Sequence, residues 1–147
     1  MTSLGKHFAA IVVAILALTA LPAVGQAKED KSAGLFVNLT TLETSKAAHA
    51  FMLANGASKR GHPVVIFLNH KAALVAAKDV PHPSFHGQSL DQLLHMAITN
   101  GAKVVVCRMC LENHGLTEPD LVDGAIISSP DIVHSYLLDP SYNVMTW

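Results

Sequence analysis

The sequence has 147 residues, two cysteines and a formal net charge of −1, which is enough chain for one domain. Half of the residues are hydrophobic and 14% are charged, so the chain can bury a packed core. It contains no basic patch, aromatic stacking series, nucleotide-binding loop, G-x-S-x-G motif or paired-carboxylate pattern. We therefore predict no nucleic-acid partner and no cofactor, and the sequence gives no support for acyl transfer or glycoside hydrolysis.

Residues 1–27 have the pattern of a secretory signal peptide. Lys6 and His7 precede an apolar run at residues 8–21, and the small residues Gly25 and Ala27 follow it. The run is too short to cross a bilayer comfortably but matches the apolar part of a signal. We expect cleavage before residue 28, a periplasmic protein and no membrane contact afterwards. An uncleaved membrane anchor is the alternative.

The mature domain, residues 28–147, alternates between runs typical of strands and of helices. Strands are expected at residues 35–39, 64–68, 103–106, 125–127 and 143–147. Helices or helical turns are expected from residue 42 to 56 or 61, and at residues 72–78, 90–99, 117–120 and 130–138. Between them, residues 79–87 read as a proline-broken loop. This order predicts a three-layer α/β/α fold with a mostly parallel sheet of about five strands and helices on both faces.

Capping signals mark several of these helices. Thr40-x-x-Glu43 and Ser89-x-x-Gln92 have the form of capping boxes, and Ser129 precedes a first-turn proline and acid. The run at residues 64–68 lacks polar alternation, so we expect it to be a central strand covered on both sides.

Both cysteines lie where the strand at residues 103–106 ends. Cys107 follows the strand directly, and Cys110 lies one turn later, near the start of a short helical segment that ends at Gly115. Reactive groups gather at the carboxyl edge of open α/β sheets, and the free N–H groups of a helix start favour a thiolate. The pair is therefore a redox pair, a sulfur or metal site, or one buried thiol, Cys107, beside one reactive thiol, Cys110.

Neighbouring residues leave these alternatives open. The aromatic and Gly-Pro residues of a thioredoxin motif are missing, and no second C-x-x-C completes a zinc site. Arg108 favours a thiolate and Glu112 opposes it.

Three histidines are candidates to act beside the cysteines. His114 lies four residues after Cys110, close enough to act as a base or to share a metal. His82 and His86 lie in the loop at residues 79–87 and could approach the same edge, and imidazole with thiolate suits copper or zinc. The alternative is that these histidines are solvated polar groups.

The order and spacing of several segments resemble the DsrE/DsrF-like sulfur-relay family. These segments are the strand end Asn38-Leu39-Thr40-Thr41, the run Val104-Val105-Val106-Cys107, the spacing from Cys110 to Gly115, and Leu121-Val122-Asp123-Gly124-Ala125. The resemblance implies the α/β/α fold described above, assembly into homotrimers or homohexamers, and a cysteine that carries sulfur as a persulfide.

Two positions match the family's sulfur-accepting cysteine, eight or five residues before the glycine, and these are Cys107 and Cys110. We favour Cys110 as the acceptor, Cys107 as its partner or resolving thiol, and His114 as the proton acceptor. The expected partners are a sulfur donor or acceptor protein, or a small sulfane sulfur species. The expected export departs from the family, whose relay members are mostly cytoplasmic.

Two other functions remain open at this stage. One is a periplasmic soft-metal module built from Cys107, Cys110 and His114, with His82 or His86 as a further ligand. The other is an oligomeric α/β domain without chemistry of its own. Whether the protein is an enzyme is left undecided.

Overall fold

A computed structural model describes residues 33–147. The expected signal peptide lies outside the described residues. No helix in the described part of the chain has both the length and the apolar character needed to cross a bilayer.

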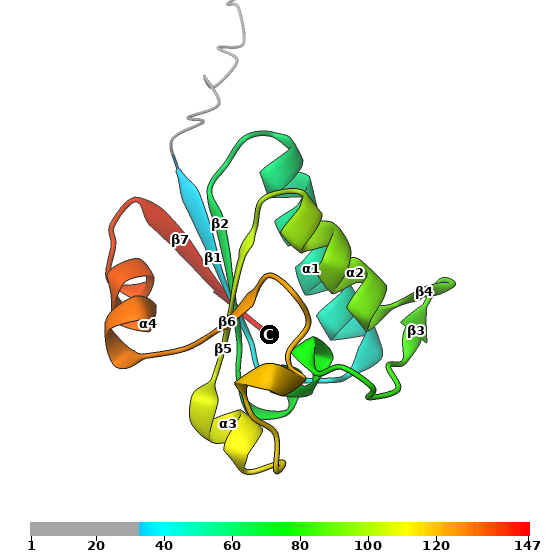
Figure 1. Ribbon diagram of the computed structural model, residues 1–147. Helices are drawn as coiled ribbons and strands as arrows, with labels where there is room; N and C mark the ends of the chain where they lie inside the picture. Colours follow the sequence, from blue (N-terminus) through cyan, green and yellow to red (C-terminus); the bar gives the residue numbers. More distant parts are fainter. Residues whose placement is uncertain (1–32) are drawn as a thin grey trace, which may run out of the picture.

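A five-stranded sheet in the order β6-β5-β2-β1-β7 forms the centre of the molecule (Figure 1). Every neighbouring pair in this sheet is parallel. Its strands are β1 (Gly34–Leu39), β2 (Val64–Leu68), β5 (Lys103–Val106), β6 (Ala125–Ile127) and β7 (Tyr142–Thr146). The predicted fold class is confirmed, and β2 is the central strand, as its unbroken apolar run indicates.

Helices cover both faces of the sheet. The helical segments are α1 (Thr44–Lys59), the 3-10 helix η1 (His70–Ala76), α2 (Leu90–Thr99), α3 (Arg108–Glu112), the 3-10 helix η2 (Glu118–Asp120) and α4 (Pro130–Leu137). Figure 1 shows α1 and α2 on one side of the sheet and α4 on the other, with α3 beyond the end of β5.

The two faces bury very different amounts of apolar surface. On the face of α1 and α2, Phe51 and Leu94 are fully buried in the same core cluster as Ile66 of β2. On the α4 face, the buried cluster formed by the described residues consists of Phe36, Val65 and Val105, and α4 itself has no buried residue. The main core therefore lies between the sheet and the α1–α2 layer.

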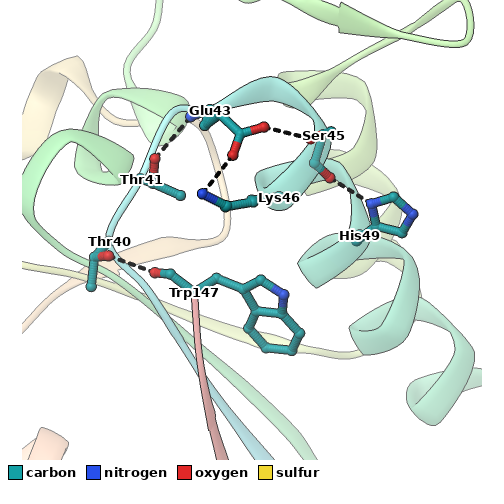
Figure 2. A network of polar contacts seen from close by, with 7 residues as sticks. All are labelled: Thr40, Thr41, Glu43, Ser45, Lys46, His49 and Trp147. Atoms are coloured by element: carbon teal, nitrogen blue, oxygen red, sulfur yellow. Dashed lines mark hydrogen bonds and ion pairs between the residues drawn. The ribbon is translucent and has the colours of Figure 1, made fainter.

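The predicted capping box at Thr40 and Glu43 is wrong. Helix α1 begins at Thr44 with Glu43 as its N-cap residue, and the Thr41 hydroxyl accepts the Glu43 N–H at 2.9 Å. The Thr40 hydroxyl instead donates to the carbonyl oxygen of Trp147, after β7 (Figure 2). The Thr40 hydroxyl, which the local pattern assigns to the start of the helix, therefore binds a carbonyl group that is distant in the sequence.

Two adjustments concern the segment between β2 and α2. The short helix predicted at residues 72–78 is the 3-10 helix η1 and begins earlier. The loop at residues 79–87 contains part of a small hairpin, β3 (Ser84–Phe85) and β4 (Gln88–Ser89). His86 and Gly87 form its two-residue turn with φ of 48° and 80°, the positive values that such a turn requires.

The other capping predictions are confirmed. At the start of α2 the Gln92 side chain accepts the Ser89 N–H at 3.0 Å, and at the start of α4 the Ser129 hydroxyl accepts the Ile132 N–H at 3.2 Å. These caps satisfy backbone donors that otherwise lack a partner, so both helix starts are fixed by local sequence.

Gly124 and Gly101 form a matched pair for a stability measurement. Both have a φ of +88°, but a Cβ at Gly124 would lie 2.7 Å from Ile98 Cγ2, whereas a Cβ at Gly101 meets nothing within 4 Å. We expect Gly101→Ala to cost about 1 to 2 kcal/mol of unfolding free energy for its backbone conformation. Gly124→Ala should cost about 1 to 3 kcal/mol more, because the Ile98 methyl branches directly from a stiff helical Cβ. Urea unfolding of both variants checks this, and equal losses would contradict it.

Candidate functional site

Cys107 and Cys110 form a disulfide at the carboxyl edge of the sheet. The Cys107 N–H extends the β2–β5 ladder by donating to the Leu68 carbonyl at 2.9 Å, so this residue is fixed to the central strand. Cys107 is also the N-cap of α3, and its sulfur accepts the Cys110 N–H at 3.2 Å. The predicted position at the strand end is confirmed.

The two sulfurs differ in exposure. Cys107 is 9% exposed, whereas Cys110 is half-buried. Leu111, which follows Cys110 in α3, is 1% exposed and packs into the main core. This contact holds α3 against the end of the sheet. The expectation of a buried first cysteine and a more accessible second one therefore agrees with the structure.

A hollow of about 250 Å³ opens on the Cys110 side of the disulfide. We call it the Cys110 hollow; its lining residues are His70, Lys71, Cys110, Asn113 and His114. The His70 N–H donates to the Cys110 sulfur at 3.1 Å. His70 has a φ of 49°, in the left-handed region that few residues other than glycine adopt. This backbone turn directs the donor at the sulfur, which favours a negative charge there.

The structure brings one of the three predicted histidines to the cysteines. His114 lines the Cys110 hollow, as expected. His82 instead lines a separate hollow with Asp91 and His95, and His86 packs edge-on against Phe85 at 4.4 Å between ring centroids. The expectation that His82 and His86 approach the cysteine edge is wrong, because the loop folds into its own hairpin.

Sequence reasoning missed His70, although a signal for it was present. His70 follows β2 directly, and the carboxyl ends of neighbouring parallel strands lie at one edge of the sheet. The same rule that places Cys107 at this edge would have placed His70 beside it.

The geometry gives no support to the metal alternative. Within residues 33–147, no group of three or more His, Cys, Asp or Glu side chains is arranged to hold a metal ion. Both thiols are also joined to each other in this structure.

A second hollow, of about 520 Å³, lies on the Cys107 side. We call it the Cys107 hollow; it is bounded by β2, the start of α3 and the start of α4, and includes Arg108, Ser128 and His134. Among residues 33–147, no aspartate or glutamate lines either hollow, so both approaches to the disulfide have cationic or neutral linings. Arg108 thus lies on the Cys107 side and not on the Cys110 side.

The loop after α3 is fixed by one carboxylate. Asp120 accepts the Thr117 N–H at 2.7 Å and the Thr117 hydroxyl at 2.8 Å. These bonds favour the charged form and hold the pKa of Asp120 below its ordinary value. The capping turn that follows the cysteine helix is therefore ionised and intact at neutral pH.

Fold and site together define a class: α/β proteins that present a pair of cysteine sulfurs at the carboxyl edge of a parallel sheet. The family comparison is more specific. The family model for the DsrE/DsrF-like family matches residues 31–147, so the chain belongs to the DsrE/DsrF-like family.

One relative and two solved structures are also similar to the chain. An uncharacterised protein of Methanocaldococcus jannaschii, MJ0760, is 32% identical over 128 residues; the match covers 80% of this chain and 46% of that protein. The chain therefore spans about half the length of this relative.

The solved structures agree in fold. The ychN protein of E. coli superposes with a TM-score of 0.65 at 17% identity, covering 78% of this chain and 99% of that one. The protein of unknown function MTH1491 from Methanobacterium thermoautotrophicum gives a TM-score of 0.63 at 10% identity, with the same coverage. At these identities the likeness establishes a common architecture only.

Proposed function

We propose that the protein carries sulfane sulfur as a persulfide on Cys110 and that Cys107 is the resolving thiol. One observation carries the proposal: the more exposed sulfur, that of Cys110, accepts the His70 N–H at 3.1 Å beside a hollow and lies within bonding reach of the second sulfur. An anionic persulfide needs such a donor and an opening to solvent. Release of the bound sulfur within the protein needs a second thiol, that of Cys107, close enough to attack the Cys110 persulfide.

In the loading step, the reduced pair reacts with a donor persulfide or polysulfide. The Cys110 thiolate attacks the outer sulfur of the donor R–S–SH, a Cys110–S–SH bond forms, the donor S–S bond breaks, and RS⁻ leaves. His114 accepts the thiol proton beforehand, and the His70 N–H favours the anionic sulfur.

Two routes then remove the sulfur. An acceptor thiolate attacks the outer sulfur and restores the Cys110 thiolate. Alternatively, the Cys107 thiolate attacks the Cys110 sulfur, releases HS⁻ and leaves the Cys107–Cys110 disulfide. In this scheme the disulfide seen in the structure is the state after release, and a thiol reductant must open it before the next loading.

Intact-mass spectrometry tests the proposal. When the reduced protein is mixed briefly with polysulfide and quenched with acid before Cys107 can react, it should gain one sulfur atom, and Cys110→Ser should gain none, because the accepting thiolate is gone. Met52→Leu, on α1 and 51% exposed, lines neither hollow; it is the control and should load like the unmodified protein. Equal loading of Cys110→Ser would contradict the proposal.

We further propose that the protein acts in the periplasm after removal of residues 1–27, and that it forms homotrimers or homohexamers. Apolar side chains on the surface favour self-association: Leu138 is 74% exposed, and Val144 and Met145 on the edge strand β7 are 46% and 40% exposed. Native mass spectra of the exported protein report both the loss of residues 1–27 and the number of subunits in the oligomer. A monomer, or a chain that retains its first 27 residues, would contradict the respective proposal.

A further inference from the structure

The Cys107 hollow has an apolar floor and a polar rim. Phe67, Met109 and Val133 supply apolar surface, and Arg108 and His134 supply cationic or hydrogen-bonding groups. In the described part of the chain, neither the Arg108 guanidinium nor the His134 ring makes an ion pair or a hydrogen bond within the protein. Both are therefore available to a ligand.

Two hydroxyl groups at the same rim also have an unused donor. The Ser128 hydroxyl oxygen accepts the Arg108 N–H at 3.2 Å, and the Ser129 hydroxyl oxygen accepts the Ile132 N–H at 3.2 Å. These bonds occupy acceptor sites and leave each O–H free to donate. Because no carboxylate from the described residues lines the hollow, the rim offers donors without a competing anion from this part of the chain.

We infer that the Cys107 hollow binds a small organic thiol that carries an anionic group, and that this thiol reopens the disulfide. The rim suits the anion, the floor suits a short carbon chain, and Cys107 lines the same hollow. Cys107 is only 9% exposed, so the hollow favours a small thiol over a cysteine on a protein surface. This inference rests on the proposed function, whose cycle requires a reductant.

The reaction balances with two equivalents of thiol. The first thiolate RS⁻ attacks the Cys107 sulfur, an R–S–S–Cys107 bond forms, the Cys107–Cys110 bond breaks, and the Cys110 thiolate leaves. The His70 N–H, 3.1 Å from that sulfur, stabilises the leaving thiolate. A second RS⁻ attacks the sulfur of R in the mixed disulfide, forms R–S–S–R and releases the Cys107 thiolate. The protein gains two electrons and the thiols lose two.

Three probe thiols of different charge test the site: mercaptoethanesulfonate, mercaptoethanol and cysteamine. The second-order rate constant for opening the disulfide, expressed per thiolate, should be highest for the sulfonate and lowest for the amine. Arg108→Gln should lower the ratio of sulfonate to neutral rate constants by about fivefold, the factor that one exposed ion pair of about 1 kcal/mol provides.

Lys71→Gln is the matched control, because it removes a cation that lines the hollow on the other side of the same bond. The sulfonate-to-neutral ratio should stay as in the unmodified protein. A loss of preference in Lys71→Gln, alone or together with Arg108→Gln, would overturn the assignment to the Cys107 hollow. So would a ratio near one in the unmodified protein.

Mapping the first adduct gives an independent readout. When the released thiol is alkylated at once, peptide masses should place the probe on Cys107 and the alkyl group on Cys110; the reverse placement would overturn the inference. Neither measurement uses sulfane sulfur. A protein that shows the charge preference but never gains sulfur would retain this site and lose the persulfide proposal.

Discussion

Cys107→Ser should load one sulfur atom on Cys110 and then fail to release it as sulfide. The variant keeps the accepting thiolate and the His70 N–H that faces it, but it lacks the only other cysteine in the chain. We therefore expect self-release of HS⁻ to fall to background when no external thiol is present. Sulfide detection after removal of excess polysulfide measures this.

The control for this experiment separates release from loading. An added small thiol supplies the missing nucleophile from outside, so it should free the stored sulfur from Cys107→Ser at a rate set by its concentration. Sulfide release by Cys107→Ser at the rate of the unmodified protein, without added thiol, would remove Cys107 from the proposed cycle. It would leave Cys110 as a carrier that other thiols discharge.

Phe51→Ala should lower the free energy of unfolding by about 3 to 5 kcal/mol, a large share of the stability of a small domain. Phe51 is fully buried in the core between α1 and the sheet, so its removal loses apolar contact and leaves a cavity. Urea unfolding followed by circular dichroism measures the change, with the slope of the transition compared to that of the unmodified protein.

Met52→Ala is its matched control on the same helix. Met52 is 51% exposed, so its truncation should change the unfolding free energy by about 0.5 kcal/mol or less. Similar losses for the two variants would contradict the assignment of the main core to this face of α1.

The elements fixed by local pattern were predictable from the sequence. The unbroken apolar run of β2 indicated a central strand, and the capping box at Ser89 and Gln92 marked the start of α2. The place of Cys107 at the end of β5 followed from strand length alone. In each case the residues that decide the structure lie within one turn or one strand of each other.

The features that failed depend on partners distant in the sequence. Thr40 has a capping pattern, but Trp147, which follows β7, lies beside it. The Thr40 hydroxyl donates a hydrogen bond to the Trp147 carbonyl oxygen instead of capping α1. His70 reaches Cys110 across 40 residues of sequence, and this pairing exists only because β2 and β5 are neighbours. Spacing rules cannot supply such contacts until the strand order is known.

The unequal layering of the sheet has a mechanical consequence. Helix α2 buries four of its residues, Leu90, Leu93, Leu94 and Ala97, whereas α4 buries none, so we expect α4 to move away from the sheet at a lower free-energy cost than α2. The Cys107–Cys110 disulfide lies beside α4, because the start of α4 forms one wall of the Cys107 hollow. Small outward displacements of α4 would widen that entrance while the main core keeps its shape.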